Sequence, residues 1–266
     1  MNLICPVCGE QLNIRDRQYV CPQQHSFDIA RQGHVNLLAV QLKHSKNPGD
    51  TKEQVASRRE FLEGGFYEPI SNALIDAARD LGLSGPVLDV GCGEGWYAAR
   101  LADALGAELT GLDISKEAVR AAAAKYKRCR WLVATAAHIP VEDGAAQLLT
   151  SLFALTLPEE FARVLAPGGY FFQVVAAEDH LLGLKGIIYD ELHHKQKDTV
   201  PDLPGFTLVK SVPIRFLFTV EGPQVQNLFA MTPHLFRIGR NGAERLRNTQ
   251  TLTDTASCVL NVYRRR

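Results

Sequence analysis

Residues 87–95 read V-L-D-V-G-C-G-E-G, and this stretch decides the fold. A short apolar run leads directly into three alternating glycines, which is typical of a strand followed by a tight turn and a helix. Because glycine has no Cβ, such a turn lets the backbone curl closely under a ligand. The stretch therefore predicts a nucleotide-binding turn, and a strand–turn–helix without any ligand is the alternative that stays open.

The acidic residues around this turn indicate which nucleotide it binds. Asp113 ends the next predicted strand, 22 residues after Gly91, where an acid can accept hydrogen bonds from both ribose hydroxyls. A dinucleotide fold has G-x-G-x-x-G, whereas here the third glycine comes one residue early and Glu94 lies inside the turn. An anionic side chain repels a pyrophosphate but suits a sulfonium, so S-adenosylmethionine fits better than NAD. The candidate cofactor residues in these two strands and the turn are Asp89, Gly91, Gly93, Glu94, Gly95 and Asp113.

Predicted strands and helices alternate along the chain after this turn. Helical patterns cover 95–105, 116–126 and 158–165, and apolar strand-like runs cover 109–114, 131–135, 147–155 and 170–176. Such alternation predicts an α/β fold whose parallel sheet is covered by helices on both faces.

Four residues near the start of the chain have the spacing of zinc ligands. Cys5 and Cys8 form C-x2-C, and Cys21 and His25 form C-x3-H after twelve intervening residues. Zinc prefers tetrahedral thiolate and imidazole ligands, and four protein ligands close the shell of a structural site. A reduced, metal-free loop is the alternative, but residues 1–36 are too poor in apolar side chains to fold without a staple. His34 and His44 lie too far from the second pair to be preferred as ligands.

Composition places the chain among ordinary globular proteins. Its 266 residues have a formal net charge of zero, so the totals give no sign of a strongly cationic nucleic-acid binder. Apolar runs long enough to span a bilayer are absent from the sequence, and the six cysteines do not suggest a disulfide framework. We therefore expect a cytoplasmic protein without membrane contact. We divide it into a zinc-binding module (1–36), a linker and helical segment (37–70) and a methyltransferase domain (71–266).

The whole chain resembles the bacterial 23S ribosomal RNA guanine methyltransferases that modify ring nitrogen 1 of a hairpin guanine. The turn D-V-G-C-G-E-G, with G-L-D-I-S after it, resembles class I S-adenosylmethionine methyltransferases in general. The narrower likeness includes C-P-V-C, C-P-Q-Q-H-S-F-D-I-A-R-Q-G-H-V-N-L-L, N-P-G-D and R-R-x-F-L-x-x-G-x-Y near the start. Further along it includes R-V-L-A-P-G-G, D-H-L-L-G-L-K and M-T-P.

The resemblance implies a Rossmann-like, mainly parallel, seven-stranded sheet, a homodimer, and a zinc module that helps to hold the rRNA hairpin. It also implies that Tyr67, Gly93, Glu94 and His180 line the cofactor site. An aromatic ring at Tyr67 could cover the sulfonium as a cation–π partner. His180 follows a predicted strand, at the sheet edge where open α/β folds bind ligands. Ordinary packing roles for Tyr67 and His180 remain open.

The chain departs from the family pattern after its fourth core strand. Ser151 stands where an arginine is expected and Leu155 where a proline is expected, in the loop that approaches the methyl group and the acceptor. A methyltransferase with another RNA or a small-molecule acceptor is therefore a second hypothesis, and a non-catalytic RNA-binding relative is a third. The sequence names no general base. Basic residues that could contact RNA phosphates, with scattered solvated charges as the alternative, are Arg31, Lys43, Lys46, Arg58, Arg59, Lys185 and Arg264–Arg266.

Overall fold

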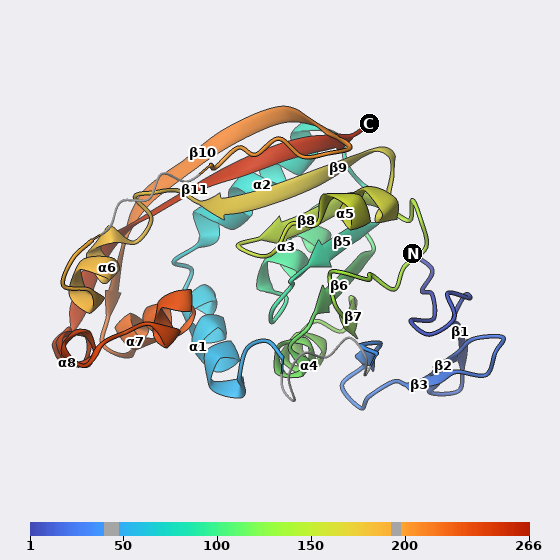
Figure 1. Cartoon of the computed structure of the whole chain (residues 1–266), viewed down its shortest axis with the longest axis horizontal. Coiled ribbons are helices and arrows are strands. Elements are labelled where there is room, and N and C mark those ends of the chain that lie inside the picture. Colours follow the sequence, from blue (N-terminus) through green and yellow to red (C-terminus); the bar gives the residue numbers. More distant parts are fainter. Residues whose placement is uncertain (40–47, 193–197) are drawn as a thin grey trace.

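The computed structural model describes residues 1–39, 48–192 and 198–266 (Figure 1). Four short strands come first and are followed by two helices; strands and helices then mostly alternate, except that β8 follows β7 directly and three consecutive helices separate β10 from β11. The elements in chain order are β1 (Asn13–Arg15), β2 (Gln18–Val20), β3 (Ser26–Asp28), β4 (Val35–Asn36), α1 (Lys52–Glu63), α2 (Glu68–Asp80), β5 (Val87–Val90), α3 (Trp96–Leu105), β6 (Leu109–Asp113), α4 (Lys116–Lys125), β7 (Arg130–Val133), β8 (Ala146–Leu152), α5 (Pro158–Val164), β9 (Leu165–Ala176), α6 (Leu182–Ile188), β10 (Phe206–Glu221), α7 (Pro223–Ala230), the 3-10 helix η2 (Pro233–Phe236), α8 (Arg240–Asn248) and β11 (Thr251–Arg265).

A large sheet forms the centre of the molecule, with the strand order β10-β11-β9-β8-β5-β6-β7-β4. The strands from β9 to β4 run parallel, and β11 and β10 add two antiparallel strands at the other side. The expected mainly parallel α/β fold is confirmed. The expected count of seven was wrong, because the described part of the chain contributes eight strands to this sheet. The additional strand is β4, whose Val35 and Asn36 pair with Leu132 and Val133 along the edge of β7.

The two faces of this sheet are covered by different elements. Buried residues of α2, α3 and α4 pack in one apolar cluster, which includes Leu74, Leu101 and Val119. A second cluster contains Phe161 of α5 and Val90 of β5, together with buried residues from the N-terminal segment. The sheet is therefore covered on both faces, as the alternating sequence pattern predicted.

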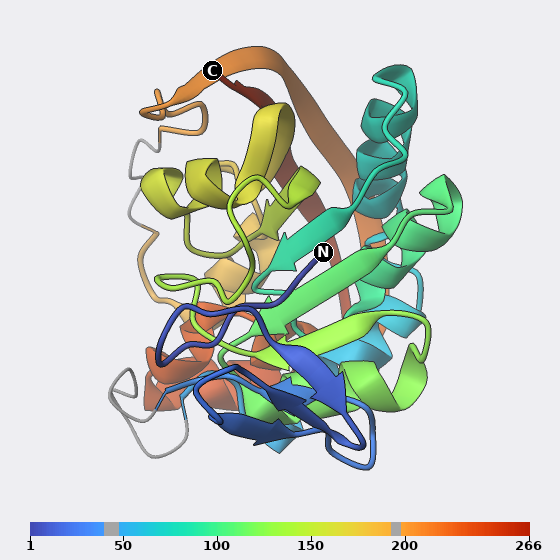
Figure 2. The same ribbon diagram turned by 90° about the vertical axis from the view of Figure 1, so that its right-hand side faces the viewer.

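The N-terminal segment folds into a three-stranded antiparallel sheet in the order β1-β2-β3. This small sheet lies beside the β7 edge of the large one (Figure 2). Leu3, Leu12 and Tyr19 are buried, and they belong to the same apolar cluster as Leu88 and Leu132 of the large sheet. The segment thus shares a hydrophobic core with the main domain and is not an independently tethered domain.

The chain between β10 and β11 carries α7, η2 and α8, which gather with α6 beyond the carboxyl ends of the parallel strands (Figure 1). Helix α7 packs against α1, and α8 packs against α6. Because ligands of open α/β folds bind at the carboxyl ends of the strands, these helices border the place where a cofactor is expected. No helix within the described residues is both long and apolar enough to cross a membrane.

Candidate cofactor cavity and metal centre

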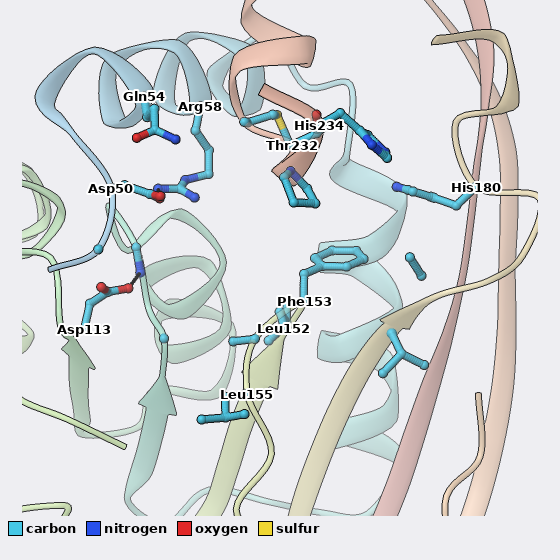
Figure 3. A pocket seen from close by; sticks show the side chains of 18 of the residues that line it. Asp50, Gln54, Arg58, Asp113, Leu152, Phe153, Leu155, His180, Thr232 and His234 are labelled. Carbon is cyan, nitrogen blue, oxygen red and sulfur yellow. Dashed lines mark hydrogen bonds and ion pairs between the residues drawn. The ribbon is translucent and has the colours of Figure 1, made fainter. Parts of the chain in front are cut away.

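A cavity of about 1410 Å³ opens at the carboxyl ends of β5, β6, β8 and β9 (Figure 3). Most of the residues that the sequence suggested for cofactor binding lie in its wall. Gly95 is the exception: it is absent from the wall, and a Cβ there would lie 2.4 Å from the Trp131 ring. The structure therefore gives Gly95 a packing position under the turn. The suggested residues that line the cavity are Tyr67, Asp89, Gly91, Gly93, Glu94, Asp113 and His180.

Two glycines shape the turn between β5 and α3. Gly91 has a φ of +76° and Gly93 a φ of +56°, both in the left-handed region that glycine adopts without a steric penalty. A Cβ on Gly91 would lie 2.8 Å from the Cβ of Ala154, in the loop after β8. The turn can therefore approach both a ligand and that loop only because position 91 lacks a side chain.

Asp113 ties the end of β6 to this turn. Its Oδ2 accepts a hydrogen bond from the Gly93 amide at 2.9 Å, and its Oδ1 accepts one from the Ser115 amide at 2.8 Å. Burial raises the pKa of the Asp113 carboxyl, and the two amide donors oppose that shift. Each carboxylate oxygen has a second lone pair, so Asp113 can still accept hydrogen bonds from a ribose diol.

Asp89 lies deeper, at the third position of β5, and is 3% exposed. The hydroxyl of Thr150 on the neighbouring strand β8 donates to its Oδ1 at 2.5 Å. Burial raises the pKa of Asp89 to about 7, and the Thr150 hydrogen bond opposes the rise. Asp89 thus forms the acidic floor of the cavity, and its charge state changes near neutral pH.

An arginine stands among these acids. Arg58 of α1 donates through Nε to Oε2 of Glu94 at 2.7 Å, and its Nη2 also contacts Asp50. Glu94 is 4% exposed, so this buried carboxylate is held by a charge-assisted partner. Sequence reasoning placed Arg58 among RNA-contacting residues, and the structure places it in the cavity. Asp50 and Arg58 belong to the N-P-G-D and R-R motifs that mark the family resemblance. A motif does not reveal, however, which distant part of the chain its residues contact in the fold.

Two tyrosine hydroxyls give an independent sign that the cavity is a ligand site. The Oη atoms of Tyr67 and Tyr97 are buried and lack a hydrogen-bond partner among the described residues, and both side chains line the cavity. Burial raises the pKa of both phenols, so both stay protonated and can donate. Unsatisfied buried hydroxyls are unusual in folded proteins. Together with the glycine turn and the acids, they fit the amino acid and ribose groups of S-adenosylmethionine.

Tyr67 itself sits in an aromatic cluster. Its ring meets Phe61 and Phe218 edge-on, with centroids 4.9 and 5.7 Å apart, and is 6.3 Å from the His180 ring. At 2% exposure it serves as packing and as cavity wall at once. The packing and ligand interpretations of Tyr67 are therefore compatible.

The departures at Ser151 and Leu155 meet in space. The buried Ser151 hydroxyl donates to the Leu155 carbonyl at 3.2 Å, which closes the loop after β8. Leu155 is 64% exposed and, with Leu152 and Phe153, lines the cavity. A side-chain hydrogen bond thus bridges the loop in which a proline was expected.

The four predicted metal ligands converge at the N-terminus. Their ligand atoms all lie within 4.8 Å of one another, and none of the six cysteines forms a disulfide. Cys8 and Cys21 Sγ atoms are 3.6 Å apart, and Cys21 Sγ is 3.4 Å from His25 Nδ1. Zinc bonds of roughly 2.0–2.3 Å in a tetrahedron give ligand separations of roughly 3.5–3.8 Å, so the cluster fits a structural zinc.

The basic residues named from the sequence do not form one stripe. Arg31 and Arg59 are exposed, Lys185 lines the cavity, and Lys43 and Lys46 lie outside the described residues. Arg264 and Arg265 are the last residues of β11, and Arg264 pairs with Tyr170 toward the amino end of β9. The tail therefore lies at the amino ends of the parallel strands, and the cavity lies at their carboxyl ends.

Comparisons with known proteins agree with both parts of this arrangement. Residues 3–46 match the family described as "RlmA, N-terminal", and residues 87–169 match the family described as "Methyltransferase domain". A 23S rRNA (guanine(748)-N(1))-methyltransferase from Streptomyces fradiae is 34% identical over 239 residues, which cover 87% of this chain and 84% of the relative.

The chain belongs to the 23S rRNA (guanine-N(1))-methyltransferase family. A member from Micromonospora griseorubida is 39% identical over 204 residues, 69% of this chain and 68% of that protein. Members of this family are S-adenosylmethionine-dependent enzymes, and the chain combines their methyltransferase fold with a structural zinc ribbon.

More distant likenesses cover less or show only the fold. A demethylmenaquinone methyltransferase from Bacillus licheniformis is 32% identical over 114 residues, only 38% of this chain. A solved structure described as "Conversion of a Disulfide Bond into a Thioacetal Group during Echinomycin Biosynthesis" has a TM-score of 0.50 and 15% identity, covering 72% of this chain and 80% of that one. The family relatives therefore match most of this chain, and the demethylmenaquinone methyltransferase matches little more than a third of it.

Proposed function

We propose that this protein transfers a methyl group from S-adenosylmethionine to ring nitrogen 1 of a guanine in a 23S rRNA hairpin. The observation that carries the proposal is an rRNA (guanine-N(1))-methyltransferase relative that matches over 87% of the chain, and the family described as "RlmA, N-terminal" matches residues 3–46. The open cavity beside exposed loop residues supports an acceptor that is larger than a small metabolite.

The cavity residues divide into two groups in this proposal. Asp113 binds the ribose hydroxyls, while Glu94, with Arg58 held against it, and the Tyr67 and Tyr97 hydroxyls bind the amino acid end. S-adenosylmethionine, when bound, supplies an electrophilic methyl group on a sulfonium. The chain contributes by aligning that donor with the acceptor nitrogen, which is the main requirement of an in-line displacement. The guanine must leave its stack to reach the cavity, which costs a few kcal/mol.

In the zinc ribbon, we assign Cys5, Cys8, Cys21 and His25 as the four ligands. The ribbon would contribute to rRNA binding through exposed basic side chains, of which Arg31 is one. We further propose a homodimer that works in the cytoplasm on ribosomal RNA, with the residue division 1–36, 37–70 and 71–266. The resemblance to the family supports the dimer, and light scattering coupled to size-exclusion chromatography tests it.

The test of the activity uses zinc-loaded protein, methyl-labelled S-adenosylmethionine and large-subunit rRNA that lacks its native base methylations. Mass spectrometry then maps any labelled nucleotide. We expect one guanine labelled at ring nitrogen 1, and loss of the label in a Cys5→Ala/Cys8→Ala variant. A protein that binds the cofactor tightly and labels no guanine would contradict the proposal, and small-molecule acceptors or RNA binding without turnover would then take its place.

A further inference from the structure

We propose that Phe153 is the platform on which the target guanine stacks beside the cofactor. The inference rests on the proposed function and goes beyond it by naming the residue that receives the base. Phe153 follows the last residue of β8, Leu152, at the carboxyl edge of the sheet, and its ring lines the cavity (Figure 3).

The first argument is the backbone of Phe153, which has a φ of +54°. A bulky side chain in the left-handed region is a steric outlier, and such outliers gather at ligand sites where the surroundings enforce them. Here the Phe153 amide donates to the Val174 carbonyl of β9 at 2.8 Å, and Ser151 and Leu155 close the loop by their own hydrogen bond. The neighbours therefore hold a conformation that packing alone does not explain.

The second argument is exposure. Phe153 is 43% exposed, and the two residues that follow it in the loop, Ala154 and Leu155, are exposed as well, Leu155 to 64%. The fold holds Phe153 in an unfavourable backbone conformation and still leaves its apolar ring open to solvent. Such a ring indicates a partner with a flat face that can stack on it. Because every nucleobase has a π-face, an unstacked base meets that requirement.

The third argument is distance from the cofactor turn. The next residue, Ala154, lies close to Gly91. A Cβ added to Gly91 would lie only 2.8 Å from the Cβ of Ala154. The loop and the glycine turn are thus in direct contact. A base stacked on Phe153 would lie beside the group held by that turn, as transfer between the two requires.

His180 supports the ring from the loop after β9. Its imidazole is stacked near Phe153, with centroids 6.0 Å apart and an interplanar angle of 29°. The Ser257 amide donates to His180 Nδ1 at 3.1 Å and thereby fixes the imidazole. Figure 3 shows both rings reaching into the cavity from different walls. One side of Phe153 is therefore backed by a fixed ring, and the guanine takes the open side.

The chemistry of the loop limits what the platform does. Residues 152–155 are Leu, Phe, Ala and Leu, so their side chains offer stacking and apolar contact but no hydrogen bond to a base edge. Phe153 therefore positions the base by stacking on its face. Hydrogen bonds that distinguish guanine from other bases must come from other cavity residues.

The experiment compares Phe153→Leu, which keeps the apolar volume and loses the ring, with Phe153→Tyr, which keeps the ring. We expect Phe153→Leu to lower kcat/KM for rRNA roughly 5- to 150-fold, the range for loss of one base–aromatic stack, with an unchanged Kd for S-adenosylmethionine by calorimetry. Phe153→Tyr should retain most of the activity. Leu217→Ala, which removes an exposed apolar side chain from β10 outside the cavity, should behave as wild type.

Ultraviolet cross-linking of the hairpin RNA, followed by peptide mass spectrometry, reports the contact directly. We expect a cross-link between the methylated guanine and the peptide that carries Phe153, and its loss in Phe153→Leu. If wild-type protein methylates rRNA and Phe153→Leu does so equally well, the platform is overturned and the proposed function stands. If wild-type protein labels no guanine, the proposed function fails and the platform falls with it.

Discussion

The Arg58 guanidinium and the Glu94 carboxylate meet at 2.7 Å, although 36 residues separate them in the chain. This pair joins helix α1, which lies between strands β4 and β5 in the chain, to the glycine turn after β5. Since Arg58 also contacts Asp50, one cation fixes two acids at the rim of the cavity. The segment between β4 and β5 therefore contributes to the wall of the cavity.

Removing this cation should destabilise the fold, because it leaves the buried Glu94 charge without a partner. We expect Arg58→Ala to lower the free energy of unfolding by about 3 kcal/mol, the cost of breaking a largely buried pair. The adjacent, exposed Arg59→Ala should change it by less than about 0.5 kcal/mol. Urea unfolding of both variants makes the comparison, and equal effects would show that the pair contributes nothing specific.

A methyl group at Gly91 should interfere with cofactor binding. Gly91→Ala would place a Cβ 2.8 Å from Ala154 in a turn that faces the cavity, so we expect S-adenosylmethionine affinity to fall at least about tenfold. Gly106→Ala is the matched control, since Gly106 has a φ of +62° and open space around it. Both variants carry the cost of a left-handed alanine, about 1 kcal/mol, and only the first should lose affinity by calorimetry.

Stability should depend on pH through Asp89. Its pKa is about 7 in the folded protein against 3.8 as the ordinary value, so between these values the folded state holds a proton that the unfolded state has released. The contribution of Asp89 to the free energy of unfolding therefore falls as pH rises through this window.

Asp89→Asn removes that dependence while keeping an acceptor for Thr150. Relative to wild type, we expect the variant to gain about 2 kcal/mol between pH 5.5 and pH 7, measured by urea unfolding without cofactor. The exposed Asp76→Asn variant should keep the wild-type profile. Parallel profiles for wild type and Asp89→Asn would contradict the raised pKa.

Zinc should be bound at about one ion per chain, because the cluster supplies four ligands. Metal analysis after dialysis should find no tightly bound zinc in Cys8→Ala and a full complement in Cys129→Ala, whose thiol lies outside the cluster. Chelation should unfold the ribbon, since binding free energy in such small modules is folding free energy. Retention of zinc by Cys8→Ala would remove Cys8 from the ligand set.

Local patterns in the sequence predicted the glycine turn, Asp113 and the metal cluster, because each depends on fixed spacing within one or two elements. The positions of Tyr97, Asp50 and Arg58 depend on how α1 and α3 pack, and no spacing rule encodes that. Strand β4 was missed for a similar reason: two residues pair with β7 only once the sheet exists. The sequence indicated the loop that contains Phe153 but not this residue within it, since its distinguishing property is a backbone angle.

The parallel pairing of Val35 and Asn36 with β7 has a mechanical consequence. If metal loss unravels the ribbon, the chain that follows it is released from the sheet, and β7 becomes an open edge with unpaired amides and carbonyls. Zinc starvation would then show as slow self-association and faster amide exchange in β7. A zinc ion held by the four ligands would in this way protect the β7 edge from pairing with another chain, although none of those ligands lines the cavity.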